Sequence, residues 1–285
     1  MRVDAHHHVW DLAVRPQPWT DALPALRWSF GMDELRPQLR AAGVDATVVV
    51  QTVTVAEETP ELLALAEQDP DVAGVVGWVD LADPAVADRI AALRSGPGGG
   101  RLVGVRHQVQ HEPDPRWLLR PAVRRGLRAV AEAGLAYDVL VTHDQLAQVV
   151  EVSRLEPGVR FVLDHAGKPP VAAGELEPWR THLVDLARSP NVTVKLSGLL
   201  AETAEQWSPA DLEPYAAAVL DAFGPGRVLA GSDWPVCTLR ADYAAADALL
   251  LSWLAPLDPD ERNAVLGGNA AAVYRLDLPE DPHRG

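Results

Sequence analysis

The chain has 285 residues, 48% of them hydrophobic, and a formal net charge of −15 at pH 7, so it can bury a large core. The acidic balance argues against a nucleic-acid partner and against binding to an anionic membrane surface, because both need clustered lysine and arginine. A single cysteine, Cys237, excludes an internal disulfide framework; with neither a signal peptide nor an apolar run of about 18 residues, we expect a cytoplasmic protein.

The first predicted strand carries two histidines, His6 and His8, two residues apart. Residues i and i+2 of a strand project from one face, so His6 and His8 are expected to point together while His7 points away. Such a pair can hold a metal ion or a reacting water. The alternative is a core strand with one satisfied histidine; a tag is disfavoured because the run lies inside a strand pattern.

The rest of the chain alternates between helical and strand patterns. A loop over 15–30, rich in proline and tryptophan, is too long for a simple connection and is a candidate lid or site wall. Further strands are predicted at 46–51, 72–81, 102–109, 136–141, 160–163, 192–196 and 227–230. Helices are predicted at 32–42, 57–68, 118–133, 145–155, 179–187, 209–223 and 243–254, with two more beginning at Asp83-Pro84 and Asp258-Pro259.

Eight strands alternating with helices predict an α/β protein built as one (β/α)8 TIM barrel, with residues 1–285 forming a single domain. A doubly wound open sheet is the alternative. That fold normally has a glycine-rich dinucleotide-binding motif after its first strand. At the corresponding position this chain has the segment 6–10 (HHHVW), which contains no glycine.

In such barrels the reacting groups lie at the C-terminal ends of the strands. His165 follows the sixth predicted strand and Asp233 the eighth. With His6 and His8 they form a plausible site for one divalent metal, for which zinc suits the nitrogen and oxygen ligands. No phosphate loop or Gly-x-Ser-x-Gly elbow competes with this site.

Five segments carry a resemblance to a known family. They are 4–10 (DAHHHVW), 104–107 (GVRH), 163–169 (LDHAGKP), 194–199 (VKLSGL) and 231–236 (GSDWPV). The chain resembles the amidohydrolase superfamily over nearly its whole length. Within it, the chain is similar to the amidohydrolase-2 branch that contains L-fuconolactonases, L-rhamnonolactonases and 2-pyrone-4,6-dicarboxylate lactonase.

The resemblance implies a central group of His6, His8, His165 and Asp233, with Asp233 as the proton carrier. It implies at most one divalent metal, and a metal-free site stays open because some members of this branch work without one. The favoured reaction is hydrolysis of a sugar-acid lactone, in which Asp233 deprotonates a water held by the histidines. The alternatives are hydrolysis of an aromatic-degradation lactone, such as 2-pyrone-4,6-dicarboxylate or a muconolactone, and decarboxylation by a metal-dependent enzyme.

Asp233 and His165 are therefore the expected catalytic residues, and other strand-end side chains are expected to bind substrate. Cations would act on the carbonyl oxygen or on a substrate carboxylate, and tryptophans would offer flat apolar faces. The substrate-binding candidates are Arg106, His107, Lys168, Lys195, Trp10, Trp78 and Trp234. For the cations, the alternative is a salt bridge to acidic residues such as Asp164 or Glu202. The expected partner is a small-molecule lactone, and assembly into a homo-oligomer is left open.

Overall fold

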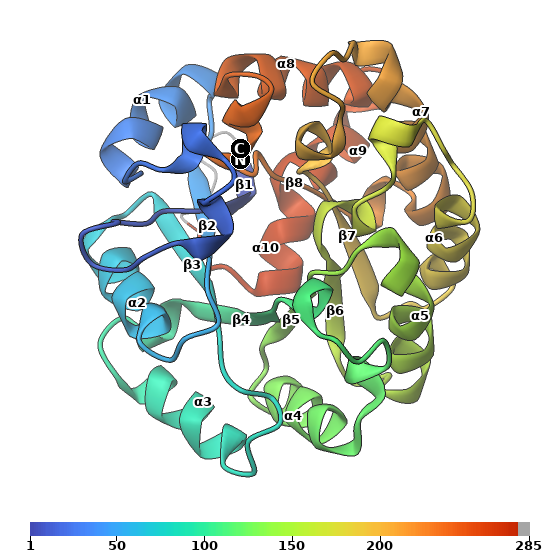
Figure 1. The fold of residues 1–285 in the computed structure, drawn as a ribbon. Helices are drawn as coiled ribbons and strands as arrows, with labels where there is room; N and C mark the ends of the chain where they lie inside the picture. Colours follow the sequence, from blue (N-terminus) through green and yellow to red (C-terminus); the bar gives the residue numbers. More distant parts are fainter. Residues whose placement is uncertain (279–285) are drawn as a thin grey trace.

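The computed structural model describes residues 1–278, in which eight parallel strands form one sheet in the order β1 to β8. The strands are β1 (Val3–His7), β2 (Ala46–Val50), β3 (Val72–Gly77), β4 (Leu102–His107), β5 (Ala136–Val139), β6 (Arg160–Leu163), β7 (Val192–Leu196) and β8 (Val228–Ala230). A bridge between His7 and Trp234 brings the two ends of the sheet together. The result is a nearly closed barrel ringed by helices (Figure 1), which confirms the predicted (β/α)8 architecture.

Two apolar layers follow from the alternation of side chains along each strand. One layer lies between strands and helices, and the other fills the barrel with small and β-branched residues such as Val48 and Val103. The short helix α10 (Asn269–Tyr274) contributes Ala270 and Tyr274 to this inner layer, and Figure 1 shows it through the ring of strands. The N-terminal part of the barrel is therefore packed, and the C-terminal ends are left for polar groups.

The outer helices are α1 (Met32–Ala42), α2 (Glu58–Gln68), α3 (Val86–Ser95), α4 (Pro121–Glu132), α5 (Leu146–Leu155), α6 (Trp179–Ala187), α7 (Pro209–Phe223), α8 (Tyr243–Leu254) and α9 (Pro259–Asn263). Helices with clear terminal signals match prediction. Gly43 ends α1 with φ of 67°, and Ser208 precedes Pro209 at the start of α7.

Several predicted boundaries are wrong. Helix α3 begins at Val86 rather than after Asp83-Pro84, because the Asp83 carboxylate accepts from the Ala85 N–H in a turn that comes first. Strand β3 ends at Gly77, not at residue 81, because the Thr59 hydroxyl bonds both backbone groups of Trp78. β4 and β5 also end two residues early, and 117–119 form a 3-10 turn ahead of α4.

Candidate active site

His6, in β1, and His8, directly after that strand, point into the barrel at its C-terminal end. The pairing of β1 with β2 shifts register between Asp4 and His7, and Asp4 accepts from the backbone N–H groups of His6 (3.2 Å) and Ser232 (2.9 Å). His7 turns outward, where its Nε2 lies 3.0 Å from the Thr47 hydroxyl. The expectation that His6 and His8 share one face while His7 points away is confirmed.

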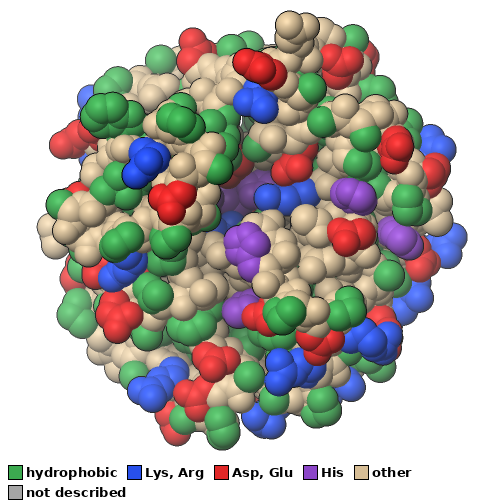
Figure 2. Space-filling view, viewed as in Figure 1, with side chains coloured by type: hydrophobic (Ala, Val, Ile, Leu, Met, Phe, Trp, Pro, Cys, Tyr) green, Lys and Arg blue, Asp and Glu red, His purple; other side chains and the backbone are tan. Residues whose placement is uncertain are grey.

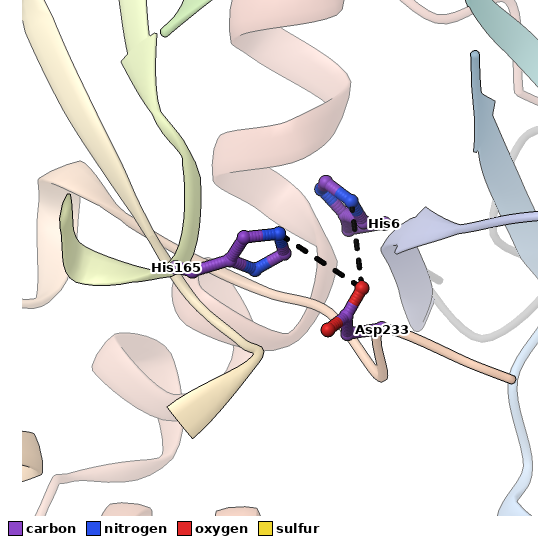
Figure 3. A group of neighbouring side chains, drawn as sticks. All are labelled: His6, His165 and Asp233. Carbon is purple, nitrogen blue, oxygen red and sulfur yellow. Dashed lines mark ion pairs between the residues drawn. The ribbon is translucent and has the colours of Figure 1, made fainter. Parts of the chain in front are cut away.

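The four predicted ligand residues meet at one place (Figure 3 shows three of them). Oδ1 of Asp233 lies 3.7 Å from His6 Nε2, 3.5 Å from His8 Nε2 and 3.9 Å from His165 Nε2. The Nε2 atoms of His6 and His8 are 3.2 Å apart. Backbone bonds join the two ends of the sheet here, from Asp233 N to His6 O (2.8 Å) and from His8 N to Trp234 O (2.7 Å).

The backbone around this site is strained. His165, Lys168 and Asp233 have φ of 52°, 50° and 56°, in the left-handed region that side chains with a Cβ rarely adopt. Gly198, with φ of 67°, lies so close to His165 that a Cβ there would be 2.3 Å from the ring Nδ1. Such strain persists only where surrounding structure enforces it, and it collects at functional sites.

The second nitrogen of each imidazole is held in place. His8 Nδ1 donates to the carbonyl of Val50 at 2.7 Å, which leaves its Nε2 as an acceptor, and His165 Nδ1 lies 3.0 Å from the Ser197 hydroxyl. Burial lowers the pKa of His8 to about 3 and of His165 to about 4. It holds the pKa of His6 well below the usual value. The three rings are therefore neutral at pH 7.

This donor set fits a divalent cation. His6, His165 and Asp233 each offer one ligand atom within 4.8 Å of the others, and His8 Nε2 borders the same space. Neutral imidazoles with a carboxylate are typical zinc ligands, and bonds to the second ring nitrogen orient such ligands. Burial also raises the pKa of Asp233, against the opposing effects of His165 and Lys168.

A network of buried charges lies beneath the histidines. Asp164 contacts Arg106 (3.2 Å), Lys195 (3.0 Å) and His6 Nδ1 (3.3 Å). Lys195 also contacts Asp138 at 2.5 Å, and the Tyr274 hydroxyl donates to the same carboxylate at 2.7 Å. Lys195, expected to bind substrate, is fully buried between two carboxylates, as the salt-bridge alternative predicted. The sequence patterns did not single out Asp138 or Tyr274 as residues of the site.

A cavity of about 240 Å³ opens above the site. Figure 2 shows the corresponding hollow, with histidine and basic side chains at its centre. The cavity is lined by His8, Trp19, Thr52, Arg106, Gln108, Gln110, His111, Leu140, His165, Lys168, Gly198, Ala201, Glu202, Asp233 and Val236. Trp19 comes from the loop expected to form a site wall. Sequence reasoning missed Trp19 and Gln108 as lining residues and treated Glu202 only as a salt-bridge partner of the cations.

Besides Lys195, four predicted substrate-binding residues lie outside this lining. Trp78 Nε1 donates to His107 Nδ1 at 3.0 Å, and His107 Nε2 lies 2.8 Å from Glu112, so these two side chains are engaged elsewhere. Trp10 and Trp234 are buried and each contacts Phe30 edge to face, and the Trp10 indole donates to the Trp28 carbonyl. Trp10 and Trp234 are therefore buried side chains outside the cavity lining.

Known proteins match this chain over its length. A sequence model of an amidohydrolase family matches residues 3–276. The L-fucono-1,5-lactonase of Burkholderia ambifaria is 39% identical, covering 99% of this chain and 98% of that protein; the enzyme of the same name from Burkholderia multivorans is 38% identical, with the same two shares. A crystal structure of a zinc-bound amidohydrolase from Burkholderia multivorans superposes with a TM-score of 0.92 at 37% identity, covering 97% of this chain and 99% of the other.

Proposed function

The chain belongs to the amidohydrolase family, and from that premise we propose that it hydrolyses a sugar-acid lactone, L-fucono-1,5-lactone or a related aldonolactone. The observation that carries the proposal is the convergence of three buried imidazoles and one carboxylate at the floor of an open cavity. The lactonases that are 38–39% identical over nearly the full chain support the substrate class.

The proposed reaction uses Asp233 first as a base and then as an acid. His6, His8 and His165 hold a water molecule. Asp233 takes a proton from this water while the water oxygen attacks the lactone carbonyl carbon. When the bond between that carbon and the ring oxygen breaks, Asp233 returns the proton to the departing oxygen. The product is a hydroxy acid that ionises to an aldonate. Arg106 and Lys168 line the cavity, and their N–H groups would donate to the carbonyl oxygen that becomes negative.

His6, His8, His165 and Asp233 would hold the metal, and the zinc-bound relative supports zinc as that metal. When bound, zinc acidifies a water ligand to a pKa of about 7 and polarises a carbonyl. Asp164, which contacts His6 Nδ1, would orient that ring as a carboxylate behind a ligating histidine does.

A panel of aldonolactones, with acid release followed on purified protein with and without chelator, tests the proposal. The expected result is rapid acid release from at least one sugar lactone, and elemental analysis of the same sample reports any bound metal. If no member of a broad panel is hydrolysed, the proposal fails. Release of CO2 from an aromatic or muconate-type acid, in place of ring opening, would decide for the decarboxylase.

Partners beyond the lactone and the place of the protein in the cell stay predictions. Among residues 1–278, no helix combines the length and the apolar character needed to cross a lipid bilayer. We propose a role in carbohydrate metabolism, which follows from the substrate class, and the cytoplasmic location stays an expectation from the sequence. A single domain over 1–285 also stays a prediction, since residues 279–285 lie outside the described part of the chain.

A further inference from the structure

Two cationic side chains line the cavity above the site, and each of them is paired with a carboxylate. Arg106 lies 3.2 Å from Asp164 beneath the floor and also donates to the Gln51 carbonyl. Lys168 Nζ lies 3.6 Å from Glu202 Oε1, and each of these two side chains is one quarter exposed. Lys168 and Glu202 are thus the charged pair of the lining that a ligand can reach from the open side.

The segments that carry Lys168 and Glu202 are both held close to His165. Lys168 follows His165, and its backbone, at φ of 50°, donates to the His165 carbonyl at 2.8 Å. Glu202 ends the short 3-10 helix Leu199–Glu202, which begins directly after Gly198 beside the His165 ring. Both side chains are therefore attached to segments that also position His165.

From this pairing we propose that Glu202 is a specificity residue: it neutralises Lys168 and so favours uncharged lactones over lactones that carry a free carboxylate. The inference rests on the proposed function, for which it narrows the substrate class to neutral sugar lactones. Arg106 is already paired with Asp164, so a carboxylate entering the cavity would have to displace Glu202 from Lys168 or lie beside Glu202 and Asp233 without a cation of its own. The same pair weakens retention of the aldonate product, which is itself an anion.

A charge series of ligands with one carbon chain tests this role without turnover. Hexitol, hexonate and hexarate carry zero, one and two carboxylates, and none contains a bond for the enzyme to hydrolyse. Affinities are measured by calorimetry for the wild type and for Glu202→Gln. We expect the ratio of hexonate affinity to hexitol affinity to rise about five-fold in Glu202→Gln, which is the effect of one charge interaction between partly exposed groups. The ratio of hexarate affinity to hexitol affinity is expected to rise further.

Two further variants identify the cause. Glu213→Gln, on the exposed surface of α7, makes the same charge change away from the cavity and is expected to leave the ratio unchanged. In the double variant Lys168→Met/Glu202→Gln, the hexonate-to-hexitol affinity ratio is expected to return to the wild-type value. The reason is that the cation that Glu202→Gln leaves without a partner, Lys168, has been removed. A Glu202→Gln protein that binds hexonate no better than the wild type does, an equal gain in Glu213→Gln, or a gain that survives in the double variant overturns the proposal.

Turnover separates this inference from the proposed function. With active enzyme, the ratio of kcat/KM for a hexarolactone to that for the matching hexonolactone is expected to rise in Glu202→Gln. If the wild type hydrolyses no lactone, the proposed function fails, whereas the affinity ratios still decide whether Glu202 selects against anions.

Discussion

The two ends of the barrel use buried space in opposite ways. The N-terminal half is filled by apolar side chains and covered by α10, and charged groups there pair at the periphery. At the C-terminal end, Asp164 and Lys195 are buried together, and His165 and Asp233 have left-handed backbone. Buried charges and strained backbone both reduce the free energy of unfolding, so apolar packing at the N-terminal end has to offset this destabilisation. This difference predicts which substitutions will alter chemistry and which will alter folding.

Asp233→Asn is expected to have the largest effect on turnover. The amide keeps the shape of the side chain but cannot take a proton from water, and general-base catalysis contributes about 10²–10⁴-fold. We expect kcat for a sugar lactone to fall on the order of 1,000-fold, while the thermal midpoint stays the same or rises because a buried carboxylate is removed. Steady-state kinetics and thermal unfolding on the same sample check both; near-normal kcat would remove Asp233 from the proposed chemistry.

Gly198→Ala is expected to impair the site through His165. A Cβ at residue 198 would lie 2.3 Å from His165 Nδ1, so the ring has to move, and a shift of about 1 Å at a reacting group can cost about 100-fold in rate. The matched control is Gly43→Ala, which has the same φ of 67° and no atom within 4 Å of the new Cβ. Both variants bear the left-handed strain of about 1–2 kcal/mol, and only Gly198→Ala should lose activity. Equal kcat in the two variants would contradict this account.

Val103→Ala makes the opposite kind of change. Val103 lies in the inner apolar cluster at the start of β4, and losing two buried methyl groups is expected to reduce the free energy of unfolding by about 1–2 kcal/mol. Denaturant unfolding measures the loss. Below the melting transition, kcat is expected to stay within roughly two-fold of the wild-type value, because residues that are far apart affect one another only weakly. A selective fall in kcat without a change in stability would break the division between the two ends.

Glu156 provides the smallest predicted effect, at the periphery of the N-terminal end. Burial raises the pKa of its carboxyl, but hydrogen bonds from Arg128 and Arg124 at 2.6–2.7 Å outweigh burial and hold the pKa below the usual value. A depressed pKa means that the stabilisation is present at neutral pH and is lost as the pH falls below the unfolded-state value of about 4.3.

Glu156→Gln should therefore reduce the free energy of unfolding at pH 7 by less than about 1 kcal/mol, and by a smaller amount at pH 3, which lies below the unfolded-state pKa. Urea titrations of both proteins at the two pH values measure this. A difference that is the same at both values would show that the carboxylate charge is not what stabilises the contact.

The sequence predicts this barrel well where local signals act alone. The bounds of α6, α7 and α8 agree with prediction because proline and cap residues mark their ends. Strand ends are predicted less well, because they depend on partners far along the chain. The hydroxyl of Thr59 in α2 ends β3 at Gly77, and no pattern within 72–81 contains that contact.

The site divides in the same way. His6, His8, His165 and Asp233 could be found because each stands at a strand end, where the barrel fold requires them to meet. Trp19 could not be found as a cavity residue, since the path of a long loop is set by tertiary contacts rather than by its own residues. Trp78 and His107 also stand at strand ends, yet they bond to each other instead of facing the cavity, and spacing alone does not distinguish the two cases.

The most direct test of the central claim measures kcat for a sugar lactone and the free energy of unfolding on two variants together, Asp233→Asn and Val103→Ala. A division of labour between the two ends predicts a crossed result: on the order of 1,000-fold lower kcat with retained stability for Asp233→Asn, and nearly normal kcat with about 1–2 kcal/mol less stability for Val103→Ala. Parallel losses in both quantities for both variants would contradict it.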